Sequence, residues 1–320
     1  SLDKSKDYLE ITLLYCEGIE EIWYIIYLGK WCCNKMKQKS KRVRRETRTA
    51  WIFLLPSFLG IFVFVLLPFL DAVRRSFFEA MGGRFVGFQN YRTVLENEAF
   101  RLAVKNTGRF ILVCIPLLLL LSLLLSLMMQ HRGDFFKVSF LIPMAIPVAS
   151  VALLWKIFFH NQGILNHLLI KLGSQPTDWM NTDYAFLVLV FSYLWKNTGY
   201  DCVLWLSGLS GIPGSIYEAA AMDGAGAFKK FFYITLPGLL PTLYVAAVMS
   251  LVNSFKVFRE AYLVAGAYPQ NSIYMLQHLL NNWFISLDIQ KMCAAAVMLA
   301  MVFALFVLLL HGLSRRGVEE

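Results

Sequence analysis

The sequence predicts an all-α membrane protein with six transmembrane helices, and two features of its composition support this fold class. Hydrophobic residues make up 58% of the 320 residues and charged residues only 16%, whereas a soluble globular domain has about 25% charged residues. The apolar residues also form blocks of the length that crosses a bilayer as a helix, which is about 20 residues. Both features exclude the class of soluble enzymes.

Six apolar blocks can be placed along the chain. The third contains Pro143 and Pro147, and the fourth is interrupted by a polar stretch that begins after Trp195. Together they predict one transmembrane domain over residues 50–316, with a short cytoplasmic end at 317–320. The expected spans cover about residues 51–70, 110–129, 138–159, 184–209, 236–255 and 292–313.

A dense basic segment just before the first block predicts the orientation. It holds Lys35, Lys37, Lys39, Lys41, Arg42, Arg44, Arg45 and Arg48. Positive residues beside a first span are retained in the cytoplasm, so both termini and the loops 130–137 and 210–235 are expected there. The loops 71–109, 160–183 and 256–291 are then external. The first external loop is also rich in basic residues, but the denser tail is expected to dominate.

The N-terminal residues 1–49 are predicted to form a basic cytoplasmic tail. The clustering of basic residues there, within a net charge of +9, is typical of a topological anchor and argues against nucleic-acid binding. The longest apolar run in the tail, Ile22–Leu28, is too short to span a bilayer. An amphipathic helix on the membrane surface and a poorly ordered tail both fit this segment.

No pattern for catalysis or for a bound metal occurs in the sequence. The six cysteines lack paired C-x-x-C spacing, and the five histidines are scattered. The G-x-x-x-x-G-K-[ST] phosphate-binding loop is also absent. We therefore expect no catalytic residue, no metal site and no cofactor in this chain.

A longer motif lies between the fourth and fifth blocks. It reads Glu218-Ala219-Ala220-Ala221-Met222-Asp223-Gly224-Ala225 and continues to Ile234-Thr235-Leu236-Pro237. This resembles the EAA signature of ABC importer permeases, in which E-A-A, a glycine and I-x-L-P stand at fixed offsets. The flanking Ile212-Pro213, Tyr217 and Phe231-Phe232 resemble the carbohydrate-uptake branch, which includes the maltose and glycerol-phosphate permeases.

The resemblance implies a type I ABC importer permease fold with a cytoplasmic coupling helix, in a bacterial plasma membrane. It implies four kinds of partner: membrane lipid, a second and similar permease, two ATP-binding cassette subunits and an external solute-binding protein. ATP and Mg would be bound by the cassette subunits. Tyr217 before the motif resembles the first permease of a heterodimeric pair. The residues implied to couple the chain to the ATPase are Glu218, Ala219, Ala220, Asp223 and Gly224.

The residue types in the motif fit this role on physical grounds. The three alanines favour a short helix, and Glu218 is expected in its first turn, where a carboxylate suits the helix dipole. Gly224 allows a break after that helix, and Pro237 fits the beginning of the next one. The expected result is a helix–break–helix loop whose Glu218 and Asp223 bind basic groups of a partner.

Two polar stripes lie inside predicted spans and are candidates for the solute pathway. Lys196 and Tyr200 share a face of the fourth span, with Asn197 beside them, and Ser250, Asn253 and Ser254 share a face of the fifth. In the maltose-type permeases that the chain resembles, solute contacts come from these parts of the same two spans. Hydroxyl and amide groups on one face of a span also join helices to one another.

Several alternatives remain open at this point. Lys196 can pair with Asp201 within the same span, which would make both residues structural. The solute can be a sugar or oligosaccharide, or a phosphorylated polyol, a polyamine or a peptide. A secondary carrier without an ATPase is a further possibility, but such carriers usually show internal repeats and acid relays, and neither is evident in this sequence.

Overall fold

The computed structural model describes residues 41–80, 83–130 and 139–319. The chain divides into two compact units, residues 1–74 and 75–320. Residues 1–40 of the predicted tail 1–49, which include its possible interfacial helix, and most of the predicted loop 130–137 lie outside the described residues. The described part is helical apart from turns and one isolated β-bridge between Phe78 and Phe85, which confirms the all-α fold class.

The described part of the first unit is one long helix with a local change of pitch. Helix α3 (Lys41–Ile61) leads into a π-helical turn, η1 (Phe62–Leu66), and then into α4 (Leu67–Ser76), which crosses into the second unit. Pro68 lacks a backbone N–H and its ring crowds the carbonyl group four residues earlier. The wider turn, in which the Leu67 N–H bonds to the Phe62 carbonyl, accommodates this proline.

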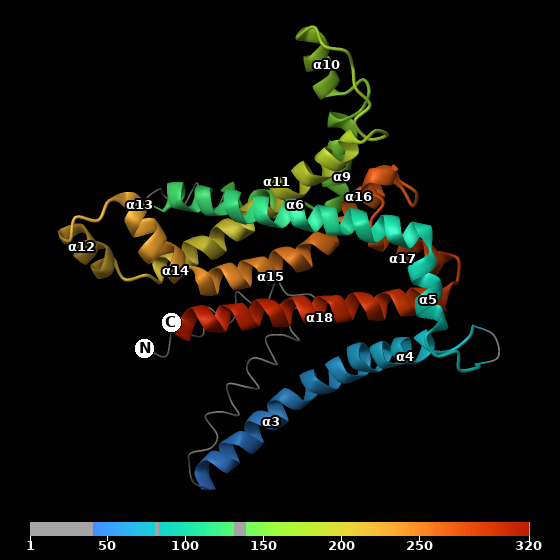
Figure 1. The fold of residues 1–320 in the computed structure, drawn as a ribbon, viewed down its shortest axis with the longest axis horizontal. Helices are drawn as coiled ribbons and strands as arrows, with labels where there is room; N and C mark the ends of the chain where they lie inside the picture. The colour runs from blue at the N-terminus through green and yellow to red at the C-terminus, as the bar shows by residue number, and fades with distance from the viewer. Residues whose placement is uncertain (1–40, 81–82, 131–138, 320) are drawn as a thin grey trace. The chain divides into compact units, whose positions relative to one another are not determined.

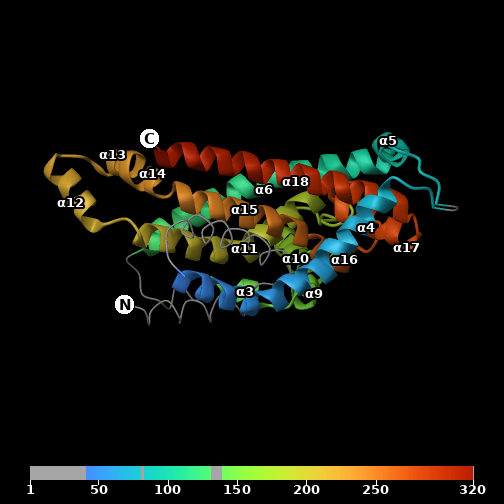
Figure 2. The same cartoon turned by 90° about the horizontal axis from the view of Figure 1, so that it is seen from below.

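The second unit is built around four long helices, shown in Figures 1 and 2. Helices α6 (Glu98–Met129), α11 (Tyr184–Ser210) and α15 (Leu240–Lys256) pack against one another, and α18 (Ile289–Glu319) packs along α15. Short helices connect them: α5 (Gln89–Glu96), α8 (Ile142–Ala145), α9 (Val148–Phe158), α10 (Ile164–Lys171), α12 (Gly214–Met222), α13 (Ala227–Lys230), α14 (Leu236–Gly238), α16 (Phe258–Ala265) and α17 (Leu276–Ile285).

One face of α6 explains how these helices come together. The residues at positions 110, 114, 118, 122 and 126 recur every fourth residue and are all almost fully buried. Phe110 and Leu118 form a hydrophobic cluster with Phe186 and Tyr193 of α11. Further along, Ser122 and Ser126 replace large side chains, so the two backbones can approach closely.

Hydrogen bonds strengthen this close approach of α6 and α11. The Trp205 indole N–H donates to Ser122 Oγ at 3.0 Å, and Ser126 Oγ donates to the Cys202 carbonyl at 3.1 Å. Hydroxyl groups between membrane helices are satisfied by such contacts because no water is available there.

Four of the six predicted spans coincide with helices that are long and apolar enough to cross a membrane. These are Trp51–Ser76, Glu98–Met129, Leu240–Ala265 and Ile289–Leu309. Helix α11 occupies the fourth predicted span with 27 residues. The third, at 138–159, is divided into α8 and α9, and α9 has only 11 residues because Pro147 precedes it as its N-cap.

Three predicted boundaries differ from the observed ones. The first helix begins at Lys41, within the predicted basic tail, and α6 begins at Glu98 rather than at residue 110. The apolar fifth span continues through α16 to Ala265, so it includes the beginning of the predicted external loop 256–291. The helices therefore extend beyond the hydrophobic blocks and include polar and charged residues.

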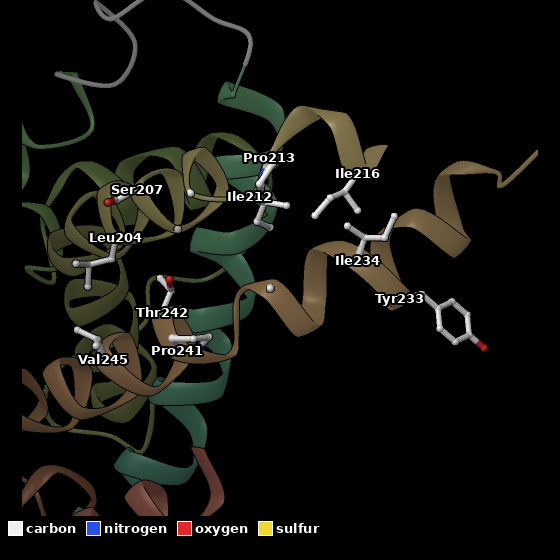
Figure 3. Close-up of a pocket in the computed structure, with 13 residues that line it drawn as sticks. Leu204, Ser207, Ile212, Pro213, Ile216, Tyr233, Ile234, Pro241, Thr242 and Val245 are labelled. Atoms are coloured by element: carbon white, nitrogen blue, oxygen red, sulfur yellow. The ribbon is translucent and has the colours of Figure 1, made fainter. Parts of the chain in front are cut away.

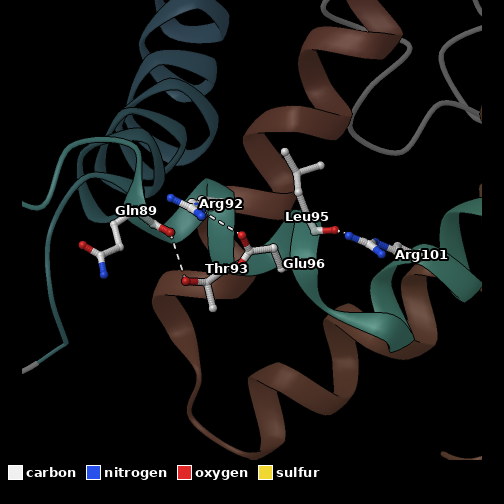
Figure 4. Close-up of polar contacts among 6 residues, drawn as sticks. All are labelled: Gln89, Arg92, Thr93, Leu95, Glu96 and Arg101. Atoms are coloured by element: carbon white, nitrogen blue, oxygen red, sulfur yellow. Dashed lines mark hydrogen bonds and ion pairs between the residues drawn. The ribbon is translucent and has the colours of Figure 1, made fainter.

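Helix α5 shows how one of these polar segments is organised (Figure 4). Arg92 Nε donates to Glu96 Oε1 at 2.8 Å, Thr93 donates to the Gln89 carbonyl, and Arg101 donates to the Leu95 carbonyl. Arg92 and Glu96 are both highly exposed, so their ion pair contributes little to stability. The buried contact between Ser76 and Tyr91 hydroxyls, 2.6 Å apart, fixes α5 to the end of α4.

Candidate functional site

The loop that carries the motif forms an exposed helix with a defined end. Pro213 is the N-cap of α12, and Gly224 follows its C-terminus with φ +74°. The Ala225 N–H bonds to the Ala220 carbonyl, and the Gly224 N–H bonds to the Ala221 carbonyl. This pair of bonds is the Schellman motif, in which the residue after the helix takes a left-handed conformation that glycine adopts without strain.

The structure therefore has the predicted helix and break, but one detail of the prediction is wrong. Because α12 begins at Gly214, Glu218 lies in its middle and not in its first turn. Glu218, Ala219, Asp223 and Gly224 are exposed and Ala220 is partly exposed. The helix dipole at the N-terminus consequently does not explain why a glutamate occupies position 218. The Glu218 carboxylate faces solvent in this unit.

Helix α12 has no buried residue within the described chain. A nine-residue helix has little stability of its own in water, so its length and exposure are features of a helix that packs against a partner. The Tyr217 and Thr235 hydroxyls, 2.9 Å apart, connect α12 to the returning segment. This contact holds the loop against the beginning of the next span.

The segment that follows the loop combines a π-helical turn with a proline, as the helix of the first unit does. A π-helical turn, η2 (Phe231–Thr235), follows α13 and lies directly before α14, which carries Pro237 in its first turn. Leu236 donates its N–H to the Phe231 carbonyl, as the wider turn requires. The predicted position of Pro237 at the beginning of a helix is confirmed, and Pro241 has the equivalent position in α15.

A cavity of about 770 Å³ lies between the end of α11, α12 and the beginning of α15 (Figure 3). Its walls are mainly apolar, with Ile212, Ile216 and Ile234 among them, and the ring of Tyr233 points away from it. At one side Gly208 lies so close to Thr242 that an added Cβ would overlap its hydroxyl. Sequence reasoning missed this cavity, because its walls are ordinary apolar residues without a motif.

A second, polar cavity of about 140 Å³ lies within the helix bundle, and we call it the polar cavity. It is lined by Met144, Val148, Ser192, Tyr193, Lys196, Asn197, Asn253, Lys256, Val257, Arg259 and Glu260. The most buried charged contact in its wall joins Lys196 Nζ to Glu260 Oε1 at 2.5 Å, with side chains only 15% and 7% exposed.

The structure divides the six predicted pathway residues into two groups of three. Lys196, Asn197 and Asn253 line the polar cavity. Tyr200, Ser250 and Ser254 do not. Ser254 Oγ donates to the Leu251 carbonyl, and Ser250 Oγ donates to Asp201 Oδ2 at 2.7 Å.

The predicted alternative of a Lys196–Asp201 pair is wrong. Asp201 contacts Ser250 of α15, whereas Lys196 points to Glu260 of α16. The Tyr193 hydroxyl donates to the Ser250 carbonyl at 2.7 Å and completes a buried polar connection between α11 and α15. Ser250 therefore acts as the structural contact between helices that the sequence left open as one interpretation.

Three charged residues of the polar cavity were missed by the sequence-based assignment: Lys256, Arg259 and Glu260. The stripe at positions 250, 253 and 254 continues at the same helical spacing to Lys256 and Glu260. Ending the fifth span at residue 255 removed them from consideration. The helix in fact runs on with only a small interruption at Val257, between α15 and α16.

Comparison with known proteins places this architecture in a family. The family model for "Binding-protein-dependent transport system inner membrane component" matches residues 119–317, which include α11, the loop and the polar cavity. A chain in the crystal structure of a bacterial ABC transporter involved in the import of the acidic polysaccharide alginate has the same fold. It aligns with a TM-score of 0.74 and 22% identity, over 86% of this chain and 99% of that one.

Relatives of known sequence are more similar. The trehalose/maltose transport system permease MalF of Thermococcus litoralis is 32% identical over 77% of this chain and 86% of its own length. The arabinooligosaccharide permease AraP of Bacillus subtilis is 32% identical over 67% and 71%, respectively. The sulfoquinovosyl glycerol permease SmoG of Agrobacterium fabrum is 30% identical over 78% and 85%. The chain thus belongs to the family of inner membrane components of binding-protein-dependent transport systems.

Proposed function

We propose that the chain is the translocation subunit of an ATP-driven importer for a sugar or oligosaccharide. The observation that carries this proposal is the exposed helix α12, held between two long helices and ended by a Schellman motif. The similar permeases named for trehalose and maltose, for arabinooligosaccharides and for sulfoquinovosyl glycerol support a carbohydrate as solute.

In the proposed assembly, α12 inserts into a groove of an ATP-binding cassette subunit. Two such subunits, a second permease and an external solute-binding protein complete the importer. A structurally similar alginate ABC transporter has been solved in complex with its periplasmic protein, which supports the last of these partners. ATP and Mg bind to the cassette subunits, so this chain performs no chemistry itself. Both termini and α12 lie on the cytoplasmic side, where the cassette subunits are.

The coupling residues are proposed to act through the exposed carboxylates of the loop, the small side chains of α12 and the direction of the chain after it. Glu218 and Asp223 are exposed carboxylates that make charge-assisted hydrogen bonds with basic groups. The small Ala219 and Ala220 let the partner approach the helix backbone. Gly224 sets the direction in which the chain leaves α12, so motion of the partner is transmitted to η2 and α15.

The test is uptake and ATP hydrolysis by the complete importer in proteoliposomes, with Glu218→Ala and Gly224→Val. Both variants are expected to lower solute-stimulated ATP hydrolysis and uptake by at least tenfold, while the assembled subunits remain in the membrane. Valine at a φ of +74° is strained by about 1–2 kcal/mol and turns the exit from α12.

Two matched controls separate this effect from general damage. Glu96→Ala removes an exposed glutamate of α5, and Gly173→Val introduces the same strain at φ +81° in open space after α10. Both controls are expected to transport normally. Undiminished transport by Glu218→Ala and Gly224→Val would refute the coupling role.

A further inference from the structure

The walls of the polar cavity carry an excess of positive charge. Lys196, Lys256 and Arg259 face it together with a single carboxylate, Glu260. Lys196 is neutralised by its 2.5 Å contact with Glu260. Lys256 and Arg259 are exposed and make no ion pair or hydrogen bond within the described residues. The cavity therefore keeps two cationic groups that no side chain of the described chain neutralises.

These positive charges lie within an apolar span, where a charged group is energetically unfavourable. Lys256 and Arg259 belong to the apolar span Leu240–Ala265, and charged groups within membrane spans usually face a cavity, a partner or a solute. They are three residues apart, so both project from the same face of the helix. An anion in the cavity would stabilise two cations on this face of the helix.

Two further polar groups of the same cavity also lack partners. Asn253 is only 7% exposed and its amide makes no hydrogen bond within the described residues, and the buried Glu260 Oε2 has none either. A buried unpaired oxygen such as Glu260 Oε2 costs free energy unless a solute or water binds it. An amide that donates and accepts, and a carboxylate oxygen that accepts, match the hydroxyl groups of a sugar ring.

We propose that the solute is an anionic sugar of the uronate class, and that Lys256 and Arg259 select it by binding its carboxylate. This inference rests on the proposed function and narrows its solute. Arg259 supplies the paired donors that a carboxylate accepts in a bidentate arrangement, and Lys256 adds a second charge. A cationic polyamine would meet like charges here, which disfavours it.

The size of the cavity indicates which part of the solute it holds. Its volume of about 140 Å³ is below the roughly 300–1,000 Å³ of sites that enclose a whole drug-sized ligand. The polar cavity therefore holds the carboxylate and the adjoining edge of one sugar ring, and the rest of an oligosaccharide extends beyond it.

The experiment compares sugars that differ only in charge. The full chain in phosphatidylcholine nanodiscs is titrated calorimetrically with galacturonate and galactose, with glucuronate and glucose, and with inorganic phosphate. Each uronate is expected to bind at least tenfold more tightly than its neutral counterpart and than phosphate. Lys256→Met and Arg259→Met are each expected to reduce this preference about tenfold, and Arg92→Met, which removes an exposed arginine of α5, is expected to preserve it.

Equal binding of the paired sugars, no binding of uronates, or an unchanged preference in both cavity variants would each overturn the proposal. Binding of phosphate as tight as that of uronates would also overturn it, because it would identify a general oxyanion site such as one for lipid headgroups. ATP-dependent uptake of neutral sugars by the complete importer decides the proposed function separately. An importer that accumulates only neutral sugars would leave that function standing and refute the uronate assignment.

Discussion

At the scale of single residues, Asp201 and Glu260, the two buried carboxylates among the described residues, are held in different ways. Glu260 meets the charged amine of Lys196 at 2.5 Å, whereas Asp201 meets only the hydroxyl of Ser250. A buried ion pair is favourable only with close geometry, because each charge loses several kcal/mol of hydration. Glu260 thus holds Lys196 in the wall of the polar cavity, while Asp201 connects α11 to α15.

His278 is a buried histidine whose ionisation opposes folding. It is fully buried in α17, its Nδ1 accepts the Met275 N–H, and it packs against the rings of Phe258 and Tyr274. Its Nε2 has no hydrogen-bond partner within the described residues. Burial lowers the pKa of His278 from 6.5 to about 4, since the charged imidazolium would lose its hydration.

The sign of the resulting pH dependence follows from this lowered pKa. Above pH 6.5 neither the folded nor the unfolded His278 is protonated, so stability is fully present. Between pH 6.5 and about 4 only the unfolded state takes up the proton, so stability falls as the pH falls. At pH 5 the loss from this residue is about 2 kcal/mol.

The measurement is the thermal unfolding midpoint of the purified chain in detergent from pH 7.5 to pH 5, for wild type and His278→Asn. Asparagine is neutral throughout, and its side-chain oxygen can accept the Met275 N–H in place of Nδ1. The variant is expected to lose less stability than wild type on acidification, and other titrating groups cancel in the comparison. Parallel pH profiles for the two proteins would contradict the assignment.

At the scale of elements, the packing of α11 depends on a glycine in its polar centre. A Cβ at Gly199 would overlap the backbone carbonyl of Phe140, in the segment before α8. Backbone cannot move aside as a side chain can, so any larger residue there separates the two segments. Gly199 thereby lets the segment leading to α8 approach α11 beside the polar stretch.

Two glycine substitutions test this packing against intrinsic helix propensity. Gly199→Ala is expected to destabilise the purified chain by roughly 1–3 kcal/mol, because of overpacking. Gly108→Ala lies within α6, where a Cβ would meet nothing within 4 Å, and it is expected to stabilise by about 0.5–1 kcal/mol. Denaturation in detergent measures both, and equal effects of the two variants would show that Gly199 makes no special contact.

The same elements show what the sequence could and could not predict. Helix α12 and its break were predictable because Pro213, the alanines and Gly224 act locally. The burial of Ser122 and Ser126 was not, since a serine within a leucine-rich helix faces lipid or a neighbour depending on how α11 packs. Glu260 was missed for a related reason: its charge is tolerated in the span only through Lys196, which is 64 residues away in the chain.

At the scale of the whole molecule, the second unit places two groups of its connecting helices at opposite ends of the bundle. Helices α12 and α13 lie at one end, near the last turns of α6 and α18, and α5, α16 and α17 lie towards the other (Figures 1 and 2). The predicted loops 210–235 and 256–291, which are expected on opposite sides of the membrane, therefore lie at opposite ends of the bundle. Which end faces the cytoplasm is a prediction that rests on the basic N-terminal segment.

The segment 160–183, which is predicted to be external, offers a well-defined reporter for that orientation. Asn166 is fully buried, and its amide bonds to the carbonyls of His160, Asn161 and Thr177, while its oxygen accepts the Trp179 indole N–H. This network holds α10 and the turn after it in one conformation. Leu172, at the end of α10, is 80% exposed, as Met222 of α12 is 89% exposed.

Cysteines at these two exposed positions are expected to be labelled from opposite sides of the membrane. In a chain with Cys16, Cys32 and Cys33 changed to serine, the remaining Cys114, Cys202 and Cys293 are buried and protected. A membrane-impermeant maleimide should then label Leu172→Cys in right-side-out vesicles and Met222→Cys only in inside-out vesicles.

Because α12 is proposed to enter a groove of the cassette subunit, that subunit should also slow labelling of Met222→Cys. Labelling of both cysteines from one side would refute the predicted topology, and labelling of Met222→Cys unaffected by the cassette subunit would refute the proposed contact.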